Sequence, residues 1–98
     1  MNNWKAFTKN IGQVKQNTRK EVSFESSQPL EISRVEPGCS SCTKFLDYKD
    51  NILTLRYEAG SFPVHLKSAG QAVINKSVTV YYENGGHDVL KFVGFLIP

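Results

Sequence analysis

Apolar and polar residues alternate along most of this chain with a period of two. In the middle of the chain, for example, Leu53, Leu55 and Tyr57 alternate with polar neighbours. Successive side chains of a β-strand point to opposite faces, so this pattern predicts strands with one face in a core and one in water. The clearest runs are Lys20–Phe24, Leu30–Val35, Asn51–Ala59 and Ser77–Tyr82.

Turn-forming residues separate these runs at near-regular intervals. The turn segments are Ser26–Pro29, Pro37–Gly38, Lys49–Asn51, Gly60–Pro63, Ser68–Gly70 and Asn84–Gly86. Adjacent Asn and Gly tolerate the positive φ of tight hairpins, so Asn84–Gly86 predicts a hairpin that joins Ser77–Tyr82 to Asp88–Phe95. Short strands at this spacing indicate an all-β sandwich or barrel.

Three segments carry weaker signals. Trp4 and Phe7 are three residues apart, which leaves room for one marginal helical turn in the first ten residues. Thr43–Tyr48 is predicted to form a short strand, and so is Val64–Leu66. No other part of the chain has the periodicity of a helix.

The C-terminal run Phe92–Ile97 abandons the alternation and is apolar on both faces of the expected strand. Monomers rarely expose large apolar patches, so something must cover this segment. One interpretation is that it packs inside the sandwich, under Trp4 and Phe7. The other is that Phe95, Leu96 and Ile97 bind a partner protein.

Length and composition limit the class of protein. The chain has 98 residues, of which 40% are hydrophobic and 11% aromatic, as expected for one globular domain spanning residues 1–98. No apolar run approaches the roughly 20 residues of a membrane span, so no membrane partner is expected. The first residues, MNNWKAFTKN, lack the apolar core of a secretory signal, and we therefore expect a protein that is not exported.

The net charge of +3 is unevenly distributed, because residues 1–20 carry +5 and the remaining residues carry −2. A basic segment that contains aromatic residues can dock on an acidic partner or on phosphate. The alternative is a solvated first strand with its lysines outward. The aromatic residues do not alternate with cations as in stacking platforms, so nucleic acid is an improbable partner. The candidate partner-binding residues of this segment are Trp4, Lys5, Phe7, Lys9, Lys15, Arg19 and Lys20.

Cys39 and Cys42 have the two-residue spacing found in half of a zinc site and in redox pairs. A structural zinc ion needs four ligands, and His65 and His87 do not have the paired spacing of a zinc finger. The residues after Cys42 predict a strand, whereas a thioredoxin-like site requires a helix there. We therefore interpret both cysteines as structural residues, reduced and largely buried at a strand corner.

No other group of residues indicates catalysis. The chain has no phosphate-binding glycine loop, and its nine carboxylates fall mainly at the polar positions of strands or in turns. The sequence thus predicts no enzyme activity, no catalytic or metal site and no cofactor.

The order of several elements resembles the Hydin/ASH-type immunoglobulin-like domains. More closely, it resembles the bacterial and phage family of unknown function that is built on the same fold. The resemblance spans about residues 12–97 and implies an immunoglobulin-like β-sandwich of about seven short strands. The elements that carry it are Val22–Phe24, Pro29–Val35, Cys39–Thr43, Lys76–Val80 and a last strand near Gly94.

The segment Ile52–Leu66 is similar to the version of this family carried by large tailed phages, including T4-like phages. The family often separates its cysteines by one residue and this chain by two, so the resemblance implies no role for them. It implies a non-enzymatic virion structural protein, most simply a capsid decoration or cement protein that binds the assembled shell in many copies. The protein would then enter the virion in the host cytoplasm.

Two alternatives remain. The first is an accessory protein of the phage neck, tail or baseplate, with other virion proteins as partners. The second is a host-surface or carbohydrate adhesion module that uses the loops Gly60–Pro63 and Asn84–His87. If the basic segment is the anchor, removing residues 1–10 is expected to weaken attachment and to leave the domain folded.

Overall fold

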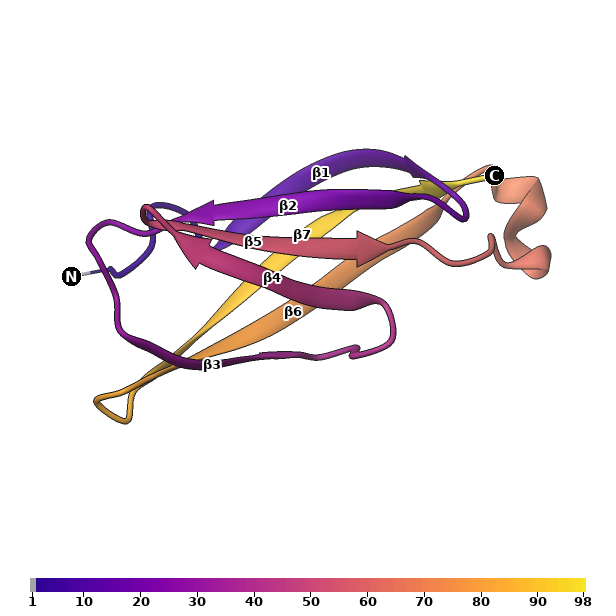
Figure 1. The fold of residues 1–98 in the computed structure, drawn as a ribbon. Coiled ribbons are helices and arrows are strands. Elements are labelled where there is room, and N and C mark those ends of the chain that lie inside the picture. Colours follow the sequence, from indigo (N-terminus) through magenta and orange to yellow (C-terminus); the bar gives the residue numbers. More distant parts are fainter. Residues whose placement is uncertain (1) are drawn as a thin grey trace.

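The computed structural model describes residues 2–98, which form seven strands and one 3₁₀-helix (Figure 1). The strands are β1 (Thr8–Lys15), β2 (Arg19–Glu25), β3 (Ile32–Pro37), β4 (Thr43–Lys49), β5 (Ile52–Glu58), β6 (Ala72–Tyr82) and β7 (His87–Ile97). The 3₁₀-helix is η1 (Val64–Ala69). The predicted strands in the middle of the chain are confirmed, with ends that differ by a few residues.

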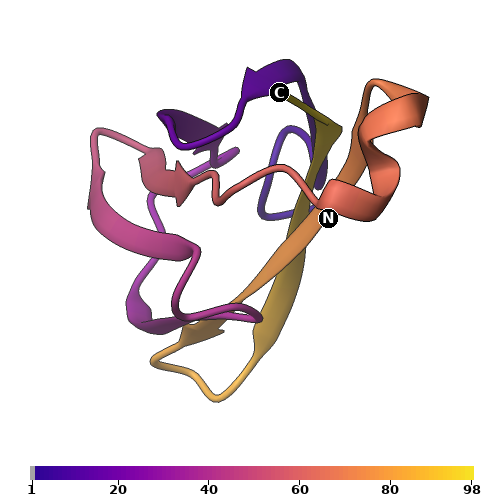
Figure 2. The ribbon, with the colours of Figure 1, turned by 90° about the vertical axis from the view of Figure 1, so that its right-hand side faces the viewer.

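The strands form two sheets that pack face to face (Figures 1 and 2). The order is β1-β7-β6-β3 in the four-stranded sheet and β2-β5-β4 in the three-stranded sheet. Neighbouring strands are antiparallel except β1, which runs parallel to β7. Strands β2, β4 and β5 face strands β3, β6 and β7, and this is the immunoglobulin arrangement. The protein is therefore an immunoglobulin-like β-sandwich.

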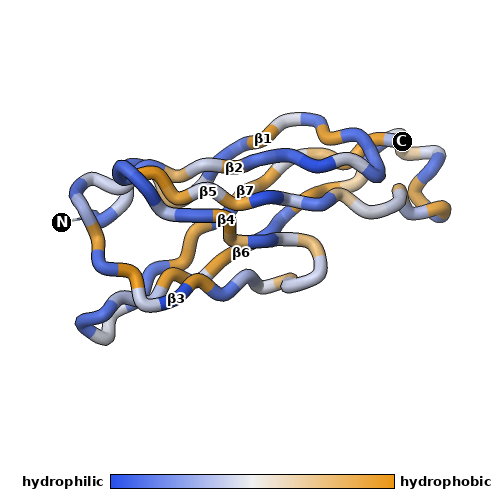
Figure 3. The backbone as a smooth tube through the Cα atoms, viewed as in Figure 1, coloured by the Kyte–Doolittle hydropathy of each residue, from blue (hydrophilic) through white to orange (hydrophobic). Residues whose placement is uncertain are grey.

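Alternating side chains of the two sheets meet in one core. The inward residues of β5 are almost completely buried, with Leu53 and Leu55 at 0% exposure. The ring of Tyr57 meets that of Phe92 edge to face, with 5.4 Å between the ring centroids, and so joins β5 to β7 across the sandwich. Hydrophobic and hydrophilic residues alternate along the strands in Figure 3, as this packing requires.

Residues 2–7 form no helix, so the expected helical turn is wrong, and two of them, Trp4 and Phe7, pack in or against the core. Trp4 is only 1% exposed and forms an antiparallel bridge with Ser26. Its indole Nε1–H donates a hydrogen bond of 2.7 Å to the hydroxyl of Tyr82. A buried and hydrogen-bonded indole stabilises the folded protein more than an isolated helical turn would. Removing residues 1–10 would take away this core side chain, which conflicts with the expectation that the domain stays folded.

The β6–β7 hairpin is as predicted, but both strands are longer than expected. β6 begins at Ala72, five residues before the predicted start. The turn contains Gly85 with φ of 95°, a conformation that glycine adopts without strain. The additional residues of β6 continue the alternation, with Val73 outward and Ile74 in the core.

The segment Val64–Leu66, predicted to be a strand, is instead the first half of η1. Pro63 precedes it, Gly70 ends it with φ of 76°, and none of its residues is buried. Of its first three residues, only Leu66 packs against the core. Within residues 2–98, no helix has the length and apolar character to cross a membrane.

Two glycines allow β1 and β7 to approach each other closely. A Cβ atom on Gly94 would collide with the carbonyl oxygen of Gly12 and lie 2.9 Å from Ile11 Cγ1. Gly12 has φ of 71°, and the register of β1 on β7 shifts between Asn10 and Gly12. The pairing of the first strand with the last therefore depends on the absence of a side chain at Gly94.

Candidate partner-binding face

The outer face of the three-stranded sheet carries charges of both signs. Arg56 on β5 lies between Glu21 on β2 and Lys44 on β4, in register with both. The guanidinium Nε of Arg56 is also 3.5 Å from a carboxylate oxygen of Glu58. Mixed charges at this density are typical of a solvated surface.

The outer face of the four-stranded sheet is different, because it exposes apolar side chains next to one another. Val73 on β6 is 76% exposed and pairs in register with Phe95 on β7, which is 40% exposed. Val93 and Ile97 lie on the same face of β7 and are half-buried. We call Val73, Val93, Phe95 and Ile97 the apolar patch. Contiguous exposed apolar surface of this kind marks interaction sites in folded proteins.

Two cationic side chains lie beside the apolar patch. Lys15 at the end of β1 is in register with Ile97, and Lys91 lies one outward position from Val93 on β7. Strands β1 and β6 contain no acidic residue, and the only acidic residue of β7 is Asp88 at its far end. The patch therefore has an apolar centre and a cationic edge, and a complementary partner has an apolar surface with carboxylates around it.

The structure separates the other basic candidates of residues 1–20 into two groups. Lys5 pairs with Glu25 at 2.8 Å, and the ammonium of Lys9 donates a hydrogen bond of 2.9 Å to the carbonyl of Ser23 on β2. Arg19 and Lys20 are exposed at the start of β2. Lys15 is exposed on the outer face of β1, in register with Ile97, whereas the exposed Lys9 is in register with the buried Phe92 and reaches toward β2.

Three apolar candidates pack in or against the core. Trp4 and Leu96 are buried at 1% and 8% exposure, so the folded domain offers little of these two side chains to a partner. Phe7 is half-buried and packs against the core, and its role in binding stays a prediction. The interpretation that Phe92–Ile97 packs partly within the sandwich is right for its inward residues, and Phe95 remains at the surface.

Sequence reasoning missed part of this face. Val73 and Lys91 were not among the candidates, and neither was Val89, which is 43% exposed. Val73 was missed because the strand was predicted to start at Ser77. The alternation of Val73 and Ile74 would have placed Val73 outward, and only the β6–β7 register brings it to Phe95.

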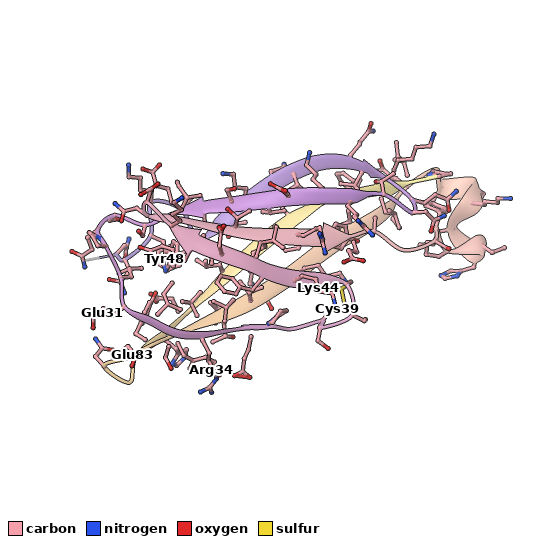
Figure 4. The ribbon with its side chains drawn as sticks, viewed as in Figure 1. Glu31, Arg34, Cys39, Lys44, Tyr48 and Glu83 are labelled. Carbon is pink, nitrogen blue, oxygen red and sulfur yellow. A yellow bond between two sulfur atoms is a disulfide. The ribbon has the colours of Figure 1, made fainter. Side chains whose placement is uncertain are left out.

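The cysteine corner is a disulfide between Cys39 and Cys42, in the loop that joins β3 to β4 (Figure 4). Their Cα atoms are 5.6 Å apart, which suits a disulfide. Both side chains are half-buried. The prediction of reduced, largely buried thiols is thus wrong, because the turn that precedes β4 brings the two cysteines together at the edge of the sandwich. Their interpretation as a structural corner fits this position.

The histidines lie on separate elements, His65 in η1 and His87 at the start of β7. The ring of His87 lies beside that of Tyr81, with 5.9 Å between centroids. Among residues 2–98, no three His, Cys, Asp or Glu side chains gather as metal ligands would.

A buried hydrogen-bond chain connects the N-terminal segment to the β6–β7 hairpin. The hydroxyl of Tyr82 accepts from Trp4 and donates to the Asp88 carboxylate at 2.7 Å. The amide of Asn3 donates to the same carboxylate oxygen at 3.1 Å. Burial, together with the hydrogen bond to Asp88, raises the pKa of Tyr82 to about 12. The chain fixes Asn3 and Trp4 against the hairpin.

Comparison with known proteins supports the fold. No protein-family model and no curated protein matches the chain. Among solved structures, the chain is similar to a mutant of the SrpA adhesin from Streptococcus sanguinis, with a TM-score of 0.55 and 10% sequence identity. The similarity covers 87% of this chain and 50% of the adhesin chain, so this protein spans about half the length of that structure. At this identity the comparison shows a shared fold.

Proposed function

We propose that this protein is a non-enzymatic binding module of a tailed-phage virion that decorates the assembled capsid shell. The observation that carries the proposal is the apolar patch with its cationic edge. Strands β1 and β7, from the two ends of the chain, form this face together with β6. A surface with an apolar centre and a charged edge is suited to docking on another protein.

The partner that fits this face is a shell protein with an apolar surface and carboxylates around it. A second copy of this chain fits less well, because symmetric pairing would bring Lys15 and Lys91 close to the same cations of the other copy. Binding would be passive. Many copies would cover apolar surface on the shell and stabilise the particle by mass action.

The location in a virion is supported by the resemblance of Ile52–Leu66 to the version of the domain carried by large tailed phages. The shell is the preferred site because a decoration protein needs one docking face and no chemistry of its own. A neck, tail or baseplate position would use the same face on a different virion protein.

The test is the occupancy of particles that were assembled without this protein and then mixed with purified variants. The double variant Val73→Glu with Phe95→Glu places two carboxylates in the apolar patch. We expect at least about tenfold weaker attachment, because a charge in the centre of an interface is desolvated without a partner. Leu46→Glu is the matched control, since Leu46 on β4 is 38% exposed and lies on the other sheet. It should attach as the unmodified protein does.

Two results would contradict the proposal. Equal occupancy of the double variant and Leu46→Glu would show that the apolar patch is not the docking face. Absence of the unmodified protein from purified particles of the phage that encodes it would remove the virion role altogether.

A further inference from the structure

A cavity of about 240 Å³ opens at the end of the sandwich that is opposite the apolar patch. It lies where β6 runs into the hairpin turn, next to the segment that leads into β3. Figure 4 shows Glu31 and Glu83 at this end of the molecule, near the β6–β7 hairpin. With about 30 Å³ per water molecule in the liquid, the cavity has room for about eight waters. It is lined by Asn3, Gln28, Pro29, Leu30, Glu31, Tyr82 and Asn84.

Hydrogen bonds fix the walls of this cavity. The backbone N–H of Leu30 donates to the hydroxyl of Tyr48 at 3.1 Å, and the N–H of Glu83 donates to the carbonyl of Glu31 at 3.0 Å. Asn3 and Tyr82 are held by their shared contact with Asp88. The wall segments are thus fixed before any ligand arrives, which lowers the cost of ordering them on binding.

Within residues 2–98, the lining offers hydrogen-bonding groups without positive charge. Asn3, Gln28 and Asn84 contribute amides and Glu31 a carboxylate, while lysine and arginine are missing from the lining. Within residues 2–98, the side chains of Gln28 and Glu31 make no hydrogen bond, so they are free to bind a ligand. Amides donate and accept, and a carboxylate accepts, which matches the hydroxyl groups of a polyol.

Pro29, Leu30 and Tyr82 also line the cavity and add a small apolar part to a mainly polar lining. The hydroxyl of Tyr82 is engaged with Trp4 and Asp88, so its ring is the part left for a ligand. A sugar ring has a face of C–H groups and a rim of hydroxyls. A small apolar part beside amides and a carboxylate therefore suits a sugar better than it suits a uniformly polar ligand.

We propose that this cavity binds one neutral sugar residue of a glycan. The proposal goes beyond docking on the shell and does not depend on it. The two sites lie at opposite ends of a sandwich whose longest extent is 47 Å. A module docked through the apolar patch would therefore hold the cavity away from the surface to which it is attached.

Other ligand classes fit the cavity less well. Phosphate, sulfate and acidic sugars need a cation in the lining, and Glu31 would repel them. A bound calcium ion takes six to eight oxygen ligands, whereas Glu31 is the only carboxylate in the lining. An apolar ligand would leave the amides without hydrogen bonds.

The experiment is an NMR titration of ¹⁵N-labelled protein, in buffer with EDTA, with the methyl glycosides of glucose, galactose, mannose and N-acetylglucosamine. We expect at least one to bind with a dissociation constant on the order of 1 mM, because a small ligand makes few contacts. The shifted amide signals should belong to the lining residues. Glu31→Ala and Gln28→Ala should each weaken binding by about tenfold.

Matched controls come from residues of the same types outside the cavity. Glu83→Ala removes a neighbouring carboxylate, and Gln71→Ala removes a glutamine at the other end of the molecule. Both should bind the sugar as the unmodified protein does. The double variant Val73→Glu with Phe95→Glu should also keep sugar binding, so failure of docking and failure of sugar binding are observed separately.

Three results would overturn the proposal. The first is no shift with any of the four neutral sugars at tens of millimolar. The second is tighter binding of a sialylated or sulfated sugar than of all four neutral ones. The third is a pattern that does not single out the cavity. Such a pattern is either signal shifts confined to the apolar patch or equal weakening of sugar binding by Glu31→Ala and Glu83→Ala.

Discussion

At the residue scale, the side chain of Tyr82 links the N-terminal segment to the β6–β7 hairpin. It lies at the end of β6, accepts a hydrogen bond from Trp4, donates one to Asp88, and lines the cavity. Asp88 is close to Tyr82 in sequence, whereas Trp4 is far from it. Alternation predicted that Tyr82 points inward, but a hydroxyl so deep in the sandwich needs the partners that only the folded chain supplies.

The pKa of Tyr82 leads to a prediction about stability in alkali. The pKa rises from 10.0 to about 12 in the folded protein, so folding favours the protonated phenol. This contribution to the free energy of unfolding is complete below pH 10 and is lost as the pH rises toward about 12. Urea denaturation across this range should show a steep loss of stability in the unmodified protein and a weaker loss in Tyr82→Phe.

At neutral pH, Tyr82→Phe should cost roughly 1–3 kcal/mol, because Trp4 and Asp88 lose a hydrogen-bond partner. Tyr81→Phe is the control, since Tyr81 lies on the outer face of the sheet, where the guanidinium of Arg34 packs on its ring at 4.0 Å. If the free energy of unfolding fell equally at alkaline pH in Tyr82→Phe and in the unmodified protein, the prediction about Tyr82 would be contradicted.

At the element scale, the strands differ in how well the sequence predicted them. β2 and β5 were predictable because one face is in the core and the other in water, which produces a clean alternation. For β1 the sequence offered only a solvated first strand without bounds, and a register shift between Asn10 and Gly12 breaks its alternation. Phe95 and Ile97 of the apolar patch were predicted as binding residues, but Val73 and Val93 were not. Local patterns do not contain the register between strands that are distant in sequence.

The close approach of β1 and β7 predicts that Gly94→Ala destabilises the domain. The new methyl group would collide with the backbone at Gly12, at a cost of about 1–3 kcal/mol or more. Thermal unfolding should show a clear decrease in Tm. Gly60→Ala is the matched control, because a Cβ atom there has no other atom within 4 Å. A Gly94→Ala protein as stable as Gly60→Ala would show that β1 can move aside without cost.

The disulfide should contribute modestly to stability. Cys39 and Cys42 are three positions apart, so their bond restricts few residues of the unfolded chain, and the loop-entropy relation gives about 2 kcal/mol. Replacing both cysteines with serine should lower the free energy of unfolding, measured by urea denaturation, by that amount and leave the domain folded. Dithiothreitol should reproduce the effect in the unmodified protein and have none in the double variant. An unmodified protein that does not respond to dithiothreitol would show that the disulfide had not formed.

At the scale of the whole molecule, the two ends of the sandwich have different chemistry. One end has an apolar patch with Lys15 and Lys91 beside it, and the other has a cavity with amides and Glu31. Composition predicted a small globular domain, and the charge pattern drew attention to the N-terminal segment. The cavity could not be predicted, because its lining comes from segments as far apart as Asn3 and Asn84.

The parallel pairing of β1 with β7 also determines how this domain responds to mechanical force. The chain enters near the cavity and leaves at Ile97, beside the apolar patch. A pull on the two termini would draw Thr8–Lys15 and Lys91–Ile97 in opposite directions along their common axis. The hydrogen bonds between these strands would then be sheared together and not opened one by one. The domain would resist such a load through the pairing that Gly94 makes possible.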